Sequence, residues 1–401
     1  MQTMLLFHLL LGGFNVAQGA IILGRSGPSC SEFRIPVTVS VENMKIDPNI
    51  NSVDSLRGAM QGIALGTLKP VKVKIQDTFN IAARYCEPEV QNPNRTNTIQ
   101  MLVHGITYSK DYWSGLGPPG AGYDGNTYSW ISYASTQGYP TLSIDRLGNG
   151  ASDRPDGLSV VQMGTHVEIT QTLINALKNG EIGGRSFQKV IYVGHWYGSL
   201  IGNLHAVKYP NTVDSYVLTG FTQKIRPSLV PTLTTGVFLP AAVAYPQRWN
   251  GQASTYFASS DEQGGNKLFF VNETSDPAFR SYNFALRGTV TVGEFISAYS
   301  STQVAPLYRG RIFVLTGQND SIFCSPGEFG EGTIAGKGDC GTGMSNLAAT
   351  TRQLYPAASV YDFNTPANTG HCNILHKNAQ EQFAVVHNWL NRFYRDVGRK
   401  W

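Results

Sequence analysis

Charged residues are scarce in this chain of 401 residues: they make up 14% of it and form no run of lysine or arginine. The net charge of +4 is therefore spread thinly, which argues against a nucleic-acid partner. The cysteines lack the close Cys/His spacing of zinc sites, and the glycine-rich stretches lack the strand context of phosphate-binding loops. The sequence thus predicts neither a metal nor a cofactor.

An apolar segment opens the chain. Met4–Ala17 is too short to span a bilayer, and Ala17-Gln18-Gly19 offers small residues to a signal peptidase. We therefore expect residues 1–19 to be a signal peptide, the protein to enter the secretory pathway, and no stable membrane span to form. The alternative is a plain apolar tail, because no lysine or arginine precedes the apolar segment.

Five cysteines agree with an oxidising compartment. Cys30 precedes one predicted strand and Cys86 ends another, so a disulfide can join adjacent strands. Cys324 and Cys340 bracket a glycine-rich loop that a local disulfide would tie down. Sequence alone does not fix connectivity, so both pairings are hypotheses, with Cys372 left as a buried free thiol.

Three asparagines, Asn94, Asn272 and Asn319, begin Asn-x-Ser/Thr patterns. Such patterns permit glycosylation of a secreted protein, although they are short enough to occur by chance. We take Asn94 and Asn272 as the candidate glycosylation sites.

Apolar segments alternate with helical ones along the rest of the chain. Predicted strands cover Phe33–Glu42, Val71–Tyr85 and the segments 98–105, 140–148, 189–195, 214–221, 311–318 and 358–364. A helical period runs over Val160–Asn179, and the closing segment 381–394 is amphipathic. Continuous apolar strands separated by helices predict an α/β fold with a mostly parallel central sheet flanked by helices.

The strand pattern is interrupted over residues 221–306, which begin with a stretch rich in proline, threonine and aliphatic residues. We expect this insertion to form a lid over the carboxyl edge of the sheet, where open α/β sheets place their ligands. Residues 20–220 and 307–401 would then be the two parts of one core.

The stretch Gly194-His195-Trp196-Tyr197-Gly198 lies between an apolar strand and a helix. This is the place of a nucleophile elbow, G-x-S-x-G, in which a sharp turn holds its apex residue at positive φ. Gly194 and Gly198 fit the turn, because a Cβ at either position would clash with the neighbouring strand or helix. The apex residue, however, is Trp196 and not serine.

Two further residues follow late strands in the order that such an elbow requires. Asp320 follows the strand at 311–318, and His371 lies in a loop between the last strand and the last helix. The order elbow, acid, histidine is that of the α/β-hydrolases. Asp145 and Arg146, after another strand, are expected to form an internal pair that fixes their turn.

With these motifs, together with His104-Gly105 after an early strand, the chain resembles the α/β-hydrolase superfamily over roughly residues 33–394. The segments DRLGNGASD and TGH are most similar to fungal secreted or secondary-metabolite members. The resemblance implies a nucleophile at position 196, an acid at Asp320 and a base at His371. It also implies that the backbone N–H groups of Ile106 and Tyr197 form an oxyanion hole.

Trp196 departs from this family pattern, because an indole has no nucleophilic atom that an imidazole can activate. Ser199 is a weak replacement, since it lies inside the following helix and faces away from the turn. Cys372 abuts His371, but sequence neighbours seldom face each other, and packing is the simpler role. A His371–Asp320 pair is nevertheless a competent general base without any serine.

Three hypotheses remain open from the sequence, all with a hydrophobic, carbonyl-containing small molecule as the partner. The first, which the intact pair favours, is a serine-independent enzyme for condensation, cyclisation or C–C lyase chemistry in secondary metabolism. The second is a serine hydrolase of esters, lactones or amides that a Ser→Trp change at position 196 has inactivated. The third is a non-catalytic protein that binds an apolar ligand, with Trp196 as an aromatic wall.

Overall fold

The protein is described here by a computed structural model that covers residues 27–64, 67–69, 71–224, 232, 235–298, 301–324, 340–341 and 346–394. The predicted signal peptide of residues 1–19 lies outside these described residues. Within them, no helix is long and apolar enough to cross a bilayer. Asn94 and Asn272 are both exposed, and their glycosylation stays a prediction.

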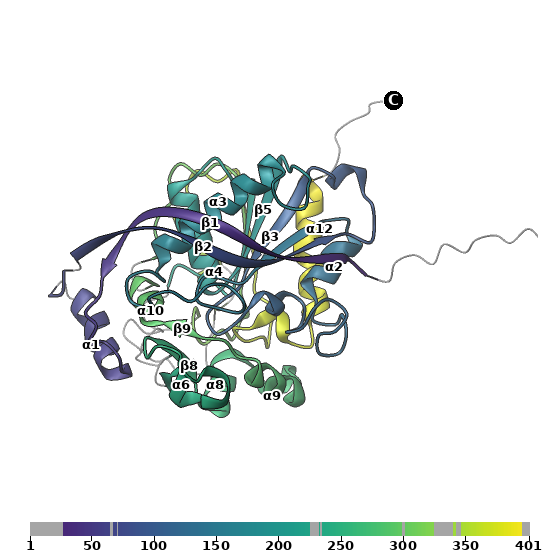
Figure 1. Ribbon diagram of the computed structural model, residues 1–401. Coiled ribbons are helices and arrows are strands. Elements are labelled where there is room, and N and C mark those ends of the chain that lie inside the picture. Colours follow the sequence, from purple (N-terminus) through teal and green to yellow (C-terminus); the bar gives the residue numbers. More distant parts are fainter. Residues whose placement is uncertain are drawn as a thin grey trace, which may run out of the picture.

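The main sheet has eight strands in the order β1-β2-β4-β3-β5-β6-β10-β11 (Figure 1). Their bounds are β1 (Ser29–Lys45), β2 (Val71–Glu87), β3 (Thr98–Val103), β4 (Thr141–Ile144), β5 (Lys189–His195), β6 (Ser215–Thr219), β10 (Arg311–Leu315) and β11 (Val360–Asn364). The six strands β4, β3, β5, β6, β10 and β11 run parallel to one another, whereas β2 is antiparallel to both β1 and β4. The predicted α/β fold with a mostly parallel sheet is confirmed.

Helices cover both faces of this sheet, which explains why its central strands are continuous apolar segments. The flanking helices are α2 (Trp130–Thr136), α3 (Met163–Asn179), α4 (Tyr197–Lys208), α11 (Leu347–Thr350) and α12 (Ala379–Phe393). α3 packs beside α4, and α12 packs beside α2 on the other side of the strands (Figure 1). Every residue of β3 and β6 is buried as a result.

The β1–β2 hairpin is longer than the two predicted strands. Its strands pair over their full length, from Ser29 opposite Glu87 to Lys45 opposite Val71. The hairpin crosses the front of the molecule and reaches beyond the sheet to α1 (Val53–Ala64) (Figure 1). The sequence signal stopped at Glu42 because the strand continues through Asn43, Met44 and Lys45, of which only Met44 is apolar.

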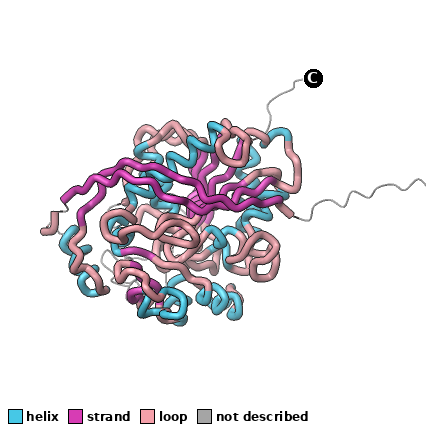
Figure 2. The backbone as a smooth tube through the Cα atoms, viewed as in Figure 1, coloured by secondary structure: helices cyan, strands magenta, loops and turns pink. Residues whose placement is uncertain are grey.

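The segment between β6 and β10 contains residues 221–306, which were predicted to form a lid. We call it the cap segment. It holds β7 (Phe238–Pro240), α6 (Ala241–Ala244), α7 (Pro246–Trp249), β8 (Tyr256–Ser259), α8 (Glu262–Phe269), α9 (Pro277–Ala285), β9 (Val290–Thr291) and α10 (Val292–Ala298). Strands β7, β8 and β9 form a small second sheet. Loops gather between this segment and the main sheet (Figure 2).

Both predicted disulfides are present. Cys30 and Cys86 are directly opposite each other in the hairpin, and their bond joins the start of β1 to the end of β2. Cys324 and Cys340 form the second disulfide, and Cys372 is the one free cysteine among the described residues. Two disulfides are compatible with an extracellular location.

Removing the disulfides tests their contribution to stability. We expect C30A/C86A to lower the unfolding free energy by about 4 kcal/mol, and C324A/C340A by about 3 kcal/mol. The difference follows from the sequence separations of 56 and 16 residues, because the longer cross-link restricts the unfolded chain more. Urea titrations of both variants measure it. A larger loss from the shorter cross-link would contradict this expectation.

Candidate active site

The elbow is built by β5, which ends at His195, and α4, which begins at Tyr197. Trp196 between them has φ 49° and ψ −108°, a backbone conformation that costs a bulky side chain about 1–3 kcal/mol. A Cβ on Gly194 would lie 2.6 Å from the carbonyl carbon of Gly198, and one on Gly198 would overlap the carbonyl oxygen of Val103. The two glycines therefore allow α4 to approach β3 and β5.

The Trp196 side chain is 1% exposed and fills the space above the turn. Its ring stacks on Tyr197 at a centroid distance of 5.9 Å and meets the rings of His371 and Phe323 edge-on, at 6.3 and 6.4 Å. The indole Nε1 is buried and has no hydrogen-bond partner in the described part of the chain. The Trp196 side chain is thus held by packing and not by a hydrogen bond, at the position where a nucleophile would stand.

Asp320 and His371 are brought together from the loops after β10 and β11. His371 Nδ1 lies 2.8 Å from Asp320 Oδ2, and both side chains are buried. The other carboxylate oxygen accepts the backbone N–H groups of Ile322 and Phe323, at 2.8 and 2.9 Å, which fixes the carboxylate. The pair has the geometry in which a carboxylate orients an imidazole for proton transfer at Nε2.

Ile106 and Tyr197 place two backbone N–H groups beside the elbow. Neither N–H donates a hydrogen bond within the part of the chain that the structure describes, although both residues are buried. A Cβ on Gly105 would lie 3.0 Å from the Cβ of Trp196, so this loop borders the apex of the elbow directly. Unpaired N–H groups on buried residues are one requirement of an oxyanion hole.

The prediction that Asp145 and Arg146 pair with each other is wrong. Asp145 Oδ2 instead lies 3.0 Å from Lys110 Nζ, and Arg146 forms a buried ion pair with Glu294 of α10. The side chains of adjacent residues in a tight turn point in different directions, so each of the two pairs with a residue of another element. Glu294 lies far away in the sequence, and no local signal could have indicated it.

Arg146 also holds the loop that carries Ile106. Its Nε donates to the carbonyl oxygen of His104 at 3.0 Å, and its Nη2 donates to that of Gly105 at 3.1 Å. Burial alone would raise the pKa of Glu294, but the charge of Arg146 and a hydrogen bond from His166 outweigh it and lower that pKa to about 2. Glu294 is therefore ionised and keeps Arg146 in place.

The cap segment is tied to the same loop through its backbone. Thr107 N–H donates to Thr289 O at 3.3 Å, and Gly288 N–H donates to Thr107 O at 2.7 Å. Thr107 itself has φ 60°, a conformation that this pairing and the neighbouring turn impose. The cap segment thus contributes structurally to the loop beside the elbow.

The two alternative nucleophiles are both engaged elsewhere. Ser199 Oγ donates to the carbonyl oxygen of Thr219 at 2.8 Å and is buried. Cys372 Sγ lies 2.8 Å from the hydroxyl of Tyr108 and 4.0 Å from Nε2 of His195, not beside the ring of its neighbour His371. Burial raises the pKa of the Cys372 thiol, so it stays protonated.

Aromatic rings that the sequence did not single out enclose the histidine. Phe323 stacks on His371 with a centroid distance of 5.9 Å, and Phe269 lies at the same distance. His195 is 4.9 Å away; burial and the neighbouring His371 lower its pKa, so it is neutral. No sequence pattern indicated Phe269, because this residue comes from the cap segment, whose fold could not be predicted from the sequence.

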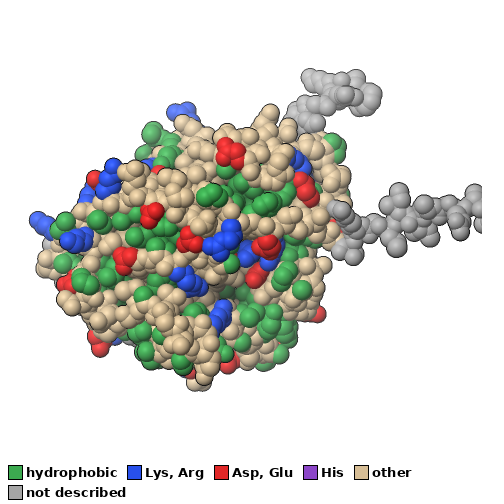
Figure 3. All heavy atoms as spheres, viewed as in Figure 1, with side chains coloured by type: hydrophobic (Ala, Val, Ile, Leu, Met, Phe, Trp, Pro, Cys, Tyr) green, Lys and Arg blue, Asp and Glu red, His purple; other side chains and the backbone are tan. Residues whose placement is uncertain are grey.

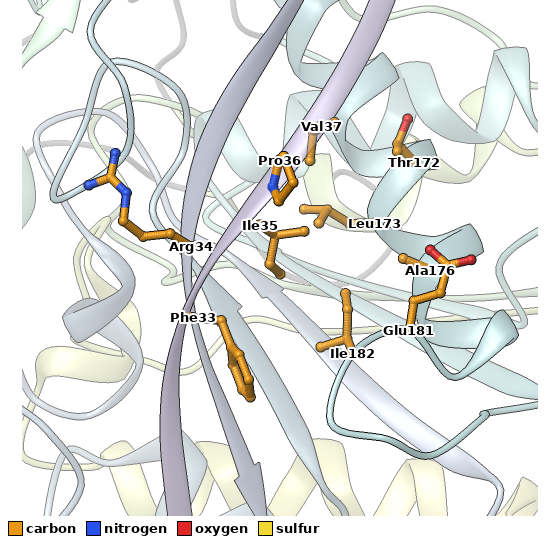
Figure 4. Close-up of a pocket in the computed structure, with 10 residues that line it drawn as sticks. All are labelled: Phe33, Arg34, Ile35, Pro36, Val37, Thr172, Leu173, Ala176, Glu181 and Ile182. Atoms are coloured by element: carbon orange, nitrogen blue, oxygen red, sulfur yellow. The ribbon is translucent and has the colours of Figure 1, made fainter.

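A cavity of about 320 Å³ lies between β1 and α3, away from this site (Figure 4). Its lining includes Phe33, Ile35, Leu173 and Ile182, and none of the predicted site residues. It lies at the outer edge of the sheet and not at the carboxyl ends of the parallel strands. Among the described residues, no group of three or more His, Cys, Asp or Glu side chains is arranged to hold a metal ion.

A mostly parallel sheet with an elbow after one strand and an acid and a histidine after two later strands defines a hydrolase-type α/β protein. The sequence profile of the alpha/beta hydrolase fold matches residues 101–323, more than half of the chain. The chain therefore belongs to the α/β-hydrolase family.

Solved structures resemble the chain at low sequence identity. A bromoperoxidase from Bacillus anthracis is 15% identical, with a TM-score of 0.50 over 78% of this chain and 96% of that one. An epoxide hydrolase from Vigna radiata is 13% identical, with a TM-score of 0.49 over the same shares. At such identities the likeness concerns the fold alone. No curated protein sequence matches the chain.

The elbow glycine is the first test of this geometry. We expect Gly198→Ala to destabilise the protein by more than about 3 kcal/mol, because its Cβ would overlap the backbone of Val103. Gly58→Ala is the matched control: it lies in α1 with open space around it, and we expect it to stabilise by up to about 1 kcal/mol. Equal unfolding free energies for the two variants would contradict the close approach.

The buried Arg146–Glu294 pair predicts a pH dependence. The folded-state pKa of Glu294, about 2, lies below its ordinary value of 4.5, so its stabilising contribution is present above pH 4.5 and is lost as the pH falls toward 2. We expect Glu294→Gln to remove this slope and to cost about 3–5 kcal/mol at neutral pH, because Arg146 loses its partner. Denaturant titrations across this pH range measure both effects.

Glu42→Gln supplies the control for that experiment. Glu42 pairs with Lys72 at 3.1 Å, and both side chains are exposed, so this ion pair contributes about 0–1 kcal/mol. A Glu294→Gln variant that behaves like Glu42→Gln at every pH would show that the buried pair does not support the loop.

Proposed function

We propose that the chain is a hydrolase of carbonyl compounds, such as esters, lactones or amides, whose acyl-transfer chemistry is blocked by Trp196. The observation that carries this proposal is the burial of Trp196 at the elbow, beside an intact Asp320–His371 pair and the two unpaired N–H groups. In this proposal the Asp320–His371 pair and these N–H groups are the rest of the machinery, and only the nucleophile is missing. The indole occupies the space where a substrate carbonyl would bind.

A serine hydroxyl at position 196 would complete the chemistry. Its Oγ attacks the carbonyl carbon while Nε2 of His371 takes the hydroxyl proton, and Asp320 stabilises the resulting imidazolium. The N–H groups of Ile106 and Tyr197 hold the negative oxygen of the tetrahedral intermediate. The histidine then returns its proton to the leaving alcohol or amine, and water hydrolyses the acyl-enzyme by the same steps.

Burial argues against the serine-independent hypothesis that the sequence favoured. A base acting alone needs the substrate to reach Nε2, yet His371 is 1% exposed and enclosed by Trp196, Phe269 and Phe323. The same enclosure argues against Trp196 as the wall of an open ligand site. The rings around His371 support a hydrophobic small molecule as the substrate, and the two disulfides support secretion.

Trp196→Ser tests the proposal directly. We expect this variant to react with a fluorophosphonate probe and to hydrolyse p-nitrophenyl acetate, whereas the chain with Trp196 does neither. Trp196→Ala is the matched control, because it opens the same space but supplies no hydroxyl. Trp196→Ser/His371→Ala should lose most of the gained activity, about 10³-fold or more, because the base is removed.

Losing the indole costs packing, so folding is checked by thermal unfolding of each variant. A folded Trp196→Ser variant that is as unreactive as Trp196→Ala would overturn the proposal. Hydrolysis by the unchanged chain that depends on His371 would also overturn it, in favour of serine-independent catalysis.

A further inference from the structure

A second cavity, of about 490 Å³, lies between the main sheet and the cap segment. Its floor comes from the segments after β3 and β4, and its other wall comes from α7, the loop that follows it, and the segment between α9 and β9. The charged and aromatic side chains in its lining are Lys110, Asp111, Asp145, Arg154, Arg248 and Trp249. Basic side chains are visible on the surface between the hairpin and the cap segment (Figure 3).

The two carboxylates of the cavity each form an ion pair with a cationic side chain. Asp145 accepts from Lys110 Nζ at 3.0 Å and from the backbone N–H groups of Lys110 and Ala151, at 2.7 and 2.9 Å. Asp111 Oδ1 lies 2.7 Å from a guanidinium nitrogen of Arg84. Both cations are shared with Glu32, whose carboxylate lies 2.6 Å from Arg84 and 3.6 Å from Lys110.

The two arginines of the cavity form no such ion pair with any described residue. Within the described part of the chain, no carboxylate forms an ion pair with Arg154 or Arg248. Arg154 donates only to the hydroxyl of Thr289, at 3.1 Å, and Arg248 only to the carbonyl oxygen of Ala285, at 3.2 Å. A guanidinium has five N–H donors, so most donors of both side chains have no partner among the described residues; Arg248 is an exposed residue and Arg154 is half-buried.

The two guanidinium groups also act on each other. Burial lowers the pKa of both arginines, and the charge of Arg154 lowers that of Arg248 further. The charges of Asp145 and Glu294 act on Arg154 without forming an ion pair and offset part of this repulsion. An anion bound between the two guanidinium groups would offset more of it. The guanidinium of Arg248 lies 4.9 Å from the ring centroid of Trp249, which adds an aromatic surface beside the charge.

We propose that this cavity is a binding site for a compact oxyanion, a carboxylate or a phosphate, held between Arg154 and Arg248. Planar guanidinium groups match both kinds of oxyanion with paired hydrogen bonds. Trp249 and Leu286 in the lining would contact an apolar part of the same ligand. The site goes beyond the proposed hydrolase function, because binding there requires no reaction at His371.

Calorimetric titration of the unchanged chain with malonate and with inorganic phosphate, in a buffer low in chloride, tests this site. We expect one of the two anions to bind with a stoichiometry of one. Malonate binding without phosphate binding assigns a carboxylate site, and the reverse assigns a phosphate site. The absence of saturable binding for both anions would overturn the proposal.

Substitutions locate the bound anion. We expect Arg154→Gln and Arg248→Gln each to raise the Kd by about 10- to 100-fold, because each removes charge-assisted hydrogen bonds. Arg185→Gln is the control, because Arg185 lies outside the cavity lining and already pairs with Glu87 at 2.9 Å. The Kd of this variant should equal that of the unchanged chain. An equal rise in all three variants would show non-specific attraction and would overturn the proposal.

Discussion

The backbone turn at residue 196 is the constraint on which the site depends. It requires positive φ at its apex and no side chain at Gly194 or Gly198, because α4 begins against the end of β3. The turn is preserved although its apex carries the largest of side chains. The backbone therefore does not need the serine in order to form: the strand, the helix and the two glycines fix the geometry, and the apex residue adapts to it.

Much of the fold was predictable, because the central strands are apolar without interruption and the helices keep their period. The strands before and after the elbow, and the positions of Asp320 and His371, follow from local patterns in chain order. The ion pair of Arg146 with Glu294 was not predictable, since the partners come from distant elements and no local pattern links them. The end of the first strand was not predictable either. The sequence predicted an end at Glu42, but pairing with β2 continues β1 to Lys45.

The enclosure of His371 could not be read from the sequence either. A histidine in a loop after the last strand predicts a base in contact with substrate, and the order of the motifs supports that. Whether a substrate can reach it depends on Phe269 of the cap segment, Phe323 and the indole, which meet only in the folded chain. Chain order thus indicates which groups form the site, whereas packing decides whether the site is open.

The links between the cap segment and the loop at Thr107 limit how this protein can admit a ligand. In many enzymes a cap swings away as a rigid body about a hinge. Here such a swing would break the backbone pairing of Thr107 with Gly288 and Thr289 and would separate Arg146 from Glu294. Opening would then dismantle the loop that holds Ile106. Without such a swing, a ligand can reach the interior only if side chains rotate aside.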